Sequence, residues 1–96
     1  MQAENGTTEG KIALKKGKLI KVRAKFRGEY IEEIRITGDF FIYPEDTIEV
    51  LERELKGKRI SDVKNIIERV MKNCEYIGVE PSDIDEAVRL AWMRRS

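Results

Sequence analysis

Side chains that commonly carry catalysis or bind metals are scarce in this chain of 96 residues. It contains no histidine, and Cys74 is its single cysteine. Zinc sites built from cysteine and histidine, histidine acid-base chemistry and disulfide frameworks are therefore excluded within one chain. Ser61 and Ser82 have no histidine to act as a base, and we interpret both as helix N-caps. The sequence predicts no catalytic residue and no metal ligands.

Nucleotide binding by this chain alone also finds no support in the sequence. Neither of the two common glycine-rich phosphate-binding motifs occurs.

We interpret the adjacent acids Glu32-Glu33 and Glu45-Asp46 as surface and helix-dipole residues. Cys74 follows an expected helix end, and we interpret it as a partly buried structural thiol rather than a reactive one.

A row of basic side chains offers binding chemistry instead. The segment 20–27 alternates apolar and basic residues: Ile20, Lys21, Val22, Arg23, Ala24, Lys25, Phe26 and Arg27. This pattern is typical of a strand with one buried and one solvated face. The basic face has the charge to contact phosphates, but no aromatic ring is interleaved with it, as stacking modules require. Nucleic-acid binding is therefore the weaker hypothesis, and neutralisation by acids of a neighbouring strand is the structural alternative.

The segment Gly38-Asp39-Phe40-Phe41 is the most suggestive of a contact with another molecule. Neighbouring residues of a regular strand face opposite ways, so two adjacent phenylalanines cannot both enter one core from a strand. One ring would then be offered to a partner. Alternatively, a sharp turn after Gly38 places both rings beneath the first helix, and the residues alone leave these two arrangements open.

A small antiparallel sheet would position these residues. Three strand patterns follow one another between residues 11 and 37, separated by turns that contain glycine. Ile31 and Ile34 are three residues apart, which breaks the alternation of buried and solvated positions. A β-bulge near Glu32-Glu33 would return both isoleucines to the buried face.

Three helical patterns follow the strands. The first covers about residues 44–57, with Pro44 in its first turn and Gly57 as its C-cap, and the others cover about residues 61–73 and 81–95. Strands followed by helices indicate an α+β fold. We expect a small three-stranded antiparallel sheet followed by three helices packed on one of its faces.

The length of the chain allows one domain, which we assign to residues 10–96. Residues 1–9 are polar and lack periodicity, so we expect a flexible leader there. No apolar run has the length of a membrane span and no secretion signal is present, which predicts a cytoplasmic protein.

Charge is distributed unevenly along the chain. Residues 1–28 hold eight Lys/Arg and two Asp/Glu, a net charge of +6, whereas residues 29–57 hold three Lys/Arg and nine Asp/Glu, a net charge of −6. The scarcity of amide side chains resembles the composition of thermophilic proteins.

The first hairpin and the segment after it resemble a known family. Two runs carry the likeness: Gly17-Lys18-Leu19-Ile20-Lys21-Val22-Arg23, and Gly28-x-x-Ile31-x-x-Ile34-x-Ile36-Thr37-Gly38-Asp39-Phe40-Phe41. They resemble the C-terminal accessory domain of lipoate-protein ligases, and the likeness covers about residues 10–95. Because no catalytic domain accompanies these residues, the chain resembles the separately encoded small subunit of a two-part archaeal ligase.

This resemblance implies a function that the residues alone do not show. In this family a large subunit binds lipoate and ATP with magnesium, forms lipoyl-adenylate and transfers the lipoyl group to a lysine of an acceptor protein. The small domain is needed for the adenylation half of the reaction. The resemblance therefore implies a non-catalytic subunit that docks on the large subunit, serves lipoyl-acceptor domains indirectly and binds no cofactor alone.

Six residues are expected to contact the large subunit: Gly38, Asp39, Phe40, Phe41, Arg23 and Lys25. The two rings would act as anchors, and Asp39 would fix the turn or bond to the partner's backbone. The basic strand would assist docking.

The same hairpin also resembles iron-sulfur scaffold proteins of the NifU type, so the expected fold is SufE/NifU-like. In those proteins a cysteine cluster ligand follows the glycine of this strand, whereas Asp39 follows Gly38 here. A scaffold or interaction domain without its own metal cluster is the alternative function.

Overall fold

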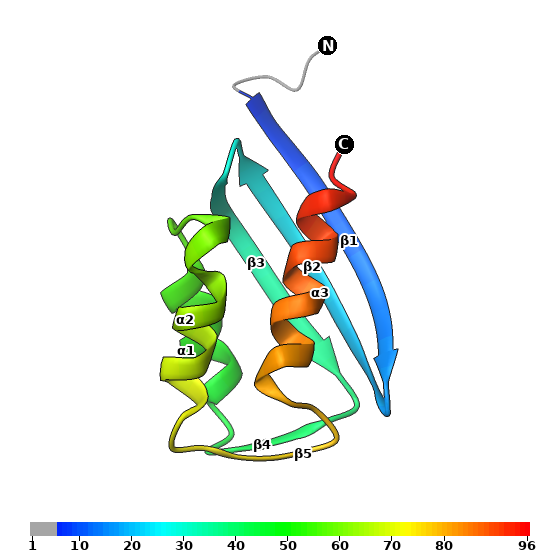
Figure 1. The fold of residues 1–96 in the computed structure, drawn as a ribbon, viewed down its shortest axis with the longest axis vertical. Helices are drawn as coiled ribbons and strands as arrows, with labels where there is room; N and C mark the ends of the chain where they lie inside the picture. The colour runs from blue at the N-terminus through cyan, green and yellow to red at the C-terminus, as the bar shows by residue number, and fades with distance from the viewer. Residues whose placement is uncertain (1–5) are drawn as a thin grey trace.

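The computed structural model of the protein describes residues 6–96, and its elements are shown in Figure 1. The elements in chain order are β1 (Thr7–Lys16), β2 (Lys18–Arg27), β3 (Tyr30–Gly38), β4 (Phe41–Tyr43), α1 (Thr47–Leu55), the short 3-10 helix η2 (Ile60–Asp62), α2 (Val63–Met71), β5 (Glu75–Ile77) and α3 (Pro81–Met93). The first three strands form an antiparallel sheet in the order β1-β2-β3, and β4 pairs with β5 in a separate two-stranded ribbon. The α+β fold with three helices is confirmed.

The predicted β-bulge lies in β3. The pairing of β2 with β3 shifts between Lys25, which faces Glu33, and Phe26, which faces Ile31, so Glu32 is the extra residue. Its carboxylate accepts hydrogen bonds from Arg27 Nε at 2.6 Å and from Thr7 Oγ1 at 3.3 Å. The hydrogen bond from Arg27 is the main cause that lowers the pKa of Glu32. The bulge therefore links all three strands while the isoleucines of β3 stay buried.

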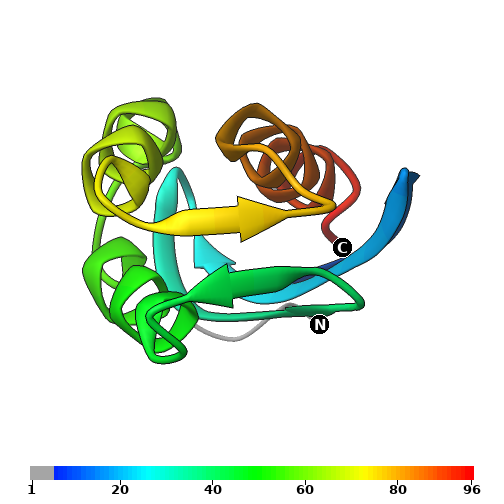
Figure 2. The ribbon, with the colours of Figure 1, turned by 90° about the horizontal axis from the view of Figure 1, so that it is seen from below.

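The helices cover one face of the sheet and one of its edges. Helix α3 packs on β1 and β2, α1 packs beside β3, and α2 contacts both of these helices. Figure 2 shows α2 and α3 on one side of the sheet and α1 at its edge. The core lies between the sheet and the helices and is built from aliphatic side chains with Phe26 at 0% exposure. No helix of residues 6–96 covers the opposite, outer face of the sheet.

Gly10 allows α3 to approach β1 closely. A β-carbon at this position would collide with the backbone carbonyl oxygen of Ala91 in α3. Only glycine leaves that space empty, because every other residue carries a β-carbon. No local sequence pattern predicts this role of Gly10, because the contact joins residues that are far apart along the chain.

Both edges of the three-stranded sheet form hydrogen bonds with other parts of the chain. The Glu52 carboxylate of α1 accepts a hydrogen bond from the backbone N–H of Ile36 in β3 at 2.7 Å. On the outer edge of β1, Glu9 and Ser96 exchange two backbone hydrogen bonds of 3.1 and 3.0 Å. Hydrogen bonds of this kind use backbone groups at a sheet edge that could otherwise pair with a strand of another molecule.

Several predicted boundaries are wrong. Strand β1 begins at Thr7, so residues 7–9 belong to the sheet and not to a flexible leader, while residues 1–5 lie outside the described residues. Helix α1 begins at Thr47 and not at Pro44. Pro44 lies in the preceding turn, where its carbonyl oxygen accepts a hydrogen bond from Thr47 Oγ1 at 2.7 Å. Gly57 follows the end of α1 with a φ of +81°, as a helix C-terminus favours.

Neither serine is an N-cap. Ser61 lies within η2, and the residue that precedes α2 is Asp62. Ser82 lies inside α3, whose N-cap is Glu80 in a capping box with Asp83. An N-cap at Ser82 would place the first helical residue at Asp83, whereas α3 begins at Pro81, because Glu80 and Asp83 supply the capping hydrogen bonds.

Candidate partner-binding surfaces

The β4–β5 ribbon displays apolar side chains to solvent. Phe41 of β4 faces Ile77 of β5 across the ribbon, and Tyr43 lies on the same side of β4 as Phe41 because side chains alternate along a strand. The exposed fractions of Phe41, Tyr43 and Ile77 are 75%, 66% and 70%. We call these three residues the apolar patch. The ribbon lies at one end of the long axis of the molecule, opposite the start of β1 and the C-terminus (Figure 1).

The turn after β3 separates the two phenylalanines. The backbone N–H of Asp39 donates to the carbonyl oxygen of Leu19 at 3.1 Å, so main-chain atoms hold the turn and the Asp39 side chain stays exposed. A β-carbon on Gly38 would collide with the Leu19 carbonyl oxygen and the Phe40 ring. Phe40 packs against the core, whereas Phe41 points outward. Of the two arrangements left open by the sequence, the structure has the one that exposes a ring.

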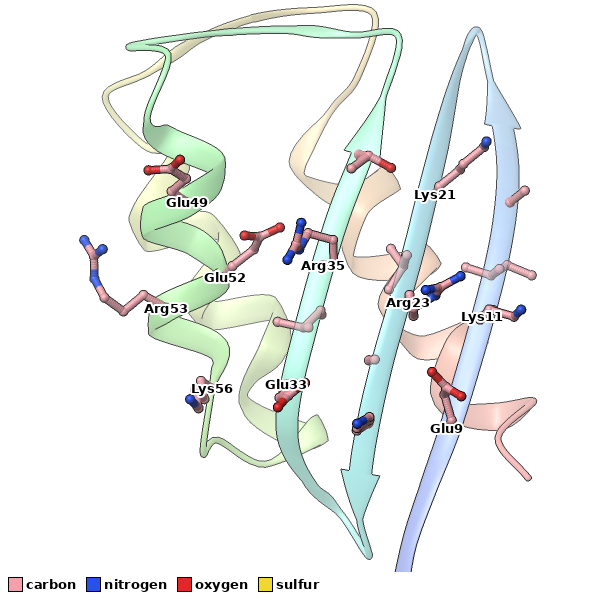
Figure 3. Close-up of a pocket in the computed structure, with 17 residues that line it drawn as sticks. Glu9, Lys11, Lys21, Arg23, Glu33, Arg35, Glu49, Glu52, Arg53 and Lys56 are labelled. Carbon is pink, nitrogen blue, oxygen red and sulfur yellow. The ribbon is translucent and has the colours of Figure 1, made fainter.

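A charged groove lies over the outer face of the sheet. It has a volume of about 1090 Å³ and is bordered by β1, β2, β3 and α1. Its lining holds seven Lys/Arg and four Glu side chains, which gives a net charge of +3. Figure 3 shows these side chains projecting from the strands and from α1. The four ion pairs found within residues 6–96 all lie outside the groove.

The pairing of the strands sorts the charges of the groove into rows. Glu9, Lys25 and Glu33 lie opposite one another, so that one cation stands between two acids. In the next row Lys11, Arg23 and Arg35 lie opposite one another with no acid among them. We call these three residues the basic row.

The six residues predicted to bind a partner fall on two separate surfaces. Arg23 and Lys25 line the charged groove, whereas the segment 38–41 belongs to the turn and ribbon outside it. The other two members of the apolar patch, Tyr43 and Ile77, were not predicted from the sequence. Ile77 was unrecognised because pairing of β4 with β5 joins segments separated by more than 30 residues.

Cys74 belongs to neither surface. It lies after α2, is half-buried, and donates from Sγ to the carbonyl oxygen of Met71 at 3.3 Å. Burial raises the pKa of the Cys74 thiol. A thiol that holds its proton more strongly is a weaker nucleophile near neutral pH, which agrees with the predicted structural role.

Within residues 6–96, no helix is long and apolar enough to cross a membrane.

Comparisons with known proteins agree on one family. The sequence matches the family model described as the C-terminus of bacterial lipoate protein ligase over residues 4–89. It is 45% identical over 78 residues to lipoate-protein ligase A subunit 2 of Thermoplasma acidophilum, which covers 79% of this chain and 81% of that protein. A solved structure from the same organism, of a bipartite lipoate protein ligase and its E2 lipoyl domain, matches with a TM-score of 0.76 and 36% identity. This match covers 86% of this chain and 94% of that chain.

Proposed function

The chain belongs to the family of bacterial lipoate protein ligase C-termini, and we propose from this premise that it is the small subunit of a two-part lipoate-protein ligase. The match to a relative named as subunit 2 over 81% of its length carries the proposal. An ATP-dependent assembly of this kind would work in the cytoplasm. The chain would contribute docking and positioning groups to an active centre on the catalytic subunit.

ATP, magnesium and lipoate would be held by the catalytic subunit, where ATP activates the lipoate carboxyl group as an adenylate. The small subunit would assist formation of the adenylate by lying over the reaction site of the catalytic subunit. A domain that covers a reaction site excludes water and holds the reacting groups in a productive arrangement. Such a role needs a stable contact surface rather than catalytic side chains on this chain.

The apolar patch suits stable docking on the catalytic subunit. Aromatic side chains that enter pockets of a partner contribute most of the binding energy at many interfaces. Phe41 and Tyr43 are more than half exposed, so their rings gain apolar contact only from another molecule. Packing of Phe40 on the core and the tight turn at Gly38 hold Phe41 in place, which lowers the entropy cost of binding.

Arg23 and Lys25 are also proposed to bind a partner. They lie in the charged groove and not on the apolar patch, so we infer that they meet a different part of the assembly.

The first experiment tests the function directly. The purified catalytic subunit is incubated with lipoate, ATP and magnesium, with and without this chain, and the lipoyl-adenylate formed is measured. We expect the adenylate to accumulate only, or much faster, when this chain is present. Equal yields in the two mixtures would contradict the proposed function.

The second experiment tests the docking surface. Phe41→Ala should weaken association with the catalytic subunit about 30-fold, the size of effect that a central aromatic anchor typically has. Its melting temperature should stay close to that of the unsubstituted chain, because the ring is exposed. Phe40→Ala should instead lower the melting temperature, because that ring packs on the core.

Met93→Ala is the matched control for Phe41→Ala. Met93 is also an exposed apolar side chain, with an exposed fraction of 69%, but it lies at the end of α3 and outside the apolar patch. Association measured by titration calorimetry should be the same for Met93→Ala and the unsubstituted chain. An equal loss of affinity in both variants would show that the apolar patch is not the contact.

A further inference from the structure

The basic row is a feature that the sheet itself does not explain. Lys11, Arg23 and Arg35 lie directly opposite one another across three strands, and like charges in this relation destabilise a sheet. No ion pair within the described part of the chain involves any of them. The neighbouring row, with Lys25 between two glutamates, shows that this sheet can balance its charges.

The side chains of the basic row are spread over a surface and do not converge on one point. Neighbouring strands are separated by about 4.8 Å, so the row extends over roughly 10 Å. Figure 3 shows Arg35 directed toward α1, while Arg23 and Lys11 lie over β2 and β1. A single phosphate needs donors that converge on it. A broad row of separated cations suits several carboxylates of a protein surface instead.

The solvation of these cations indicates a partner that binds transiently, rather than the catalytic subunit, which would stay bound. Burying the seven cations and four acids of the groove in a stable interface would remove water from each charge at a large cost. Exposed charges instead attract a partner from a distance, accelerate its encounter and release it readily. The apolar patch already provides the surface that suits stable association.

We propose that the charged groove, centred on the basic row, is the docking surface for an acidic face of the lipoyl-acceptor protein. This inference rests on the proposed function, because it assumes that the assembly transfers a lipoyl group to a protein lysine. The small subunit would then have two contacts of different chemistry. The apolar patch would hold the catalytic subunit, and the basic row would recruit the acceptor by its negative charge.

The test separates transfer from adenylation. The complete ligase is assembled with the double variant Arg23→Gln/Arg35→Gln, and steady-state lipoylation of the purified acceptor domain is measured at several salt concentrations. We expect the KM for the acceptor to rise at least tenfold, with little change in kcat. The KM of the unsubstituted ligase should rise with added salt, and this dependence should be much weaker in the variant, because screening acts on the charges that were removed.

The control is the double variant Lys64→Gln/Lys72→Gln, which removes two exposed cations at α2, outside the groove. It should have the acceptor KM of the unsubstituted ligase. The groove variant should also melt at a temperature no lower than the unsubstituted chain, because the substitutions relieve repulsion in the sheet. A defect in transfer would therefore not result from unfolding.

Three outcomes would overturn the proposal. An unchanged acceptor KM in the groove variant would exclude this docking surface. A loss of lipoyl-adenylate formation without acceptor would assign the basic row to the catalytic subunit. Competition between an oligonucleotide and the acceptor, with the oligonucleotide binding more tightly, would assign the row to nucleic acid. Failure of the unsubstituted chain to stimulate adenylation would instead contradict the proposed function.

Discussion

At the scale of single residues, backbone geometry decides what each side chain of the candidate site can do. Phe40 and Phe41 are chemically identical neighbours, yet one packs on the core and the other is exposed. The turn at Gly38, held by the hydrogen bond from Asp39 N–H to the Leu19 carbonyl oxygen, produces this difference. Phe40 therefore has a packing role, whereas the exposed ring of Phe41 is the one proposed to bind a partner.

Cys74 allows a prediction about pH. Burial raises the pKa of its thiol, so the folded chain should hold the thiol proton to a higher pH than the unfolded chain does. The rate of reaction with a disulfide reagent should therefore have a higher pH midpoint in the native protein than in denaturant. The stability contributed by the neutral thiol is present below the unfolded pKa and is lost as the pH rises through the folded pKa. A native midpoint at or below the denatured one would contradict this prediction.

At the scale of elements, the sheet depends on contacts that its strands receive from other segments. Glu32 in the bulge of β3 contacts residues of β2 and β1, Glu52 of α1 accepts a hydrogen bond at the edge of β3, and Gly10 of β1 admits the backbone of α3. Each contact is made by one residue, so each can be tested by one substitution.

Gly10→Ala should destabilise the fold by about 1–3 kcal/mol, the usual cost of forcing an extra carbon into a packed contact. The added carbon would meet the backbone of Ala91, which can move only if α3 moves. Unfolding by urea at constant pH measures the change. Thr8→Val is the control on the same strand, because the Thr8 hydroxyl is buried without a hydrogen-bond partner in the described part of the chain. That substitution should not lower the stability, and equal losses in both variants would contradict the argument.

Glu52→Ala should free the edge of β3. It removes the acceptor that lies 2.7 Å from the Ile36 amide nitrogen. A hydrogen bond to a charged group contributes roughly 1.5–3 kcal/mol, and water at this edge should reduce the loss to about 1 kcal/mol. Amide hydrogen exchange at Ile36 should become faster. Glu49→Ala, one turn earlier on α1, should leave this exchange unchanged, and a similar acceleration in both variants would exclude a specific role for Glu52.

At the scale of the whole molecule, two surfaces of different chemistry lie on one small scaffold. The molecule measures 42 × 23 × 19 Å, with the apolar patch at one end of its long axis and the charged groove over the open face of the sheet. Helices pack against the other face, so the outer face bears charged side chains without loss of the core. The two proposed contacts therefore use separate parts of the surface.

Binding of the catalytic subunit should stabilise the folded chain by mass action. At a free concentration of the catalytic subunit about 100 times the Kd, the expected gain is about 2.7 kcal/mol. Exchange of core amides such as that of Val22 should slow about 100-fold, because each 1.4 kcal/mol corresponds to a factor of about ten. Mass spectrometry of exchanged peptides follows this chain separately from its partner. Unchanged exchange at saturating concentration would contradict stable association, and Phe41→Ala should require more catalytic subunit for the same protection.

The sequence alone determined the parts of this protein that depend on local periodicity. The alternation in residues 20–27, the spacing of Ile31 and Ile34 and the helical patterns predicted the sheet, the bulge near Glu32 and the helices. These signals are local because buried positions repeat every second residue in a strand and every third or fourth in a helix.

Only the tertiary structure decided which side chains from distant segments meet. The pairing of Phe41 with Ile77, the approach of Ala91 to Gly10 and the register that aligns the basic row all join separate parts of the chain. No local pattern encodes them, because each depends on how the elements pack around the shared core. The apolar patch and the charged groove are therefore properties of the folded molecule.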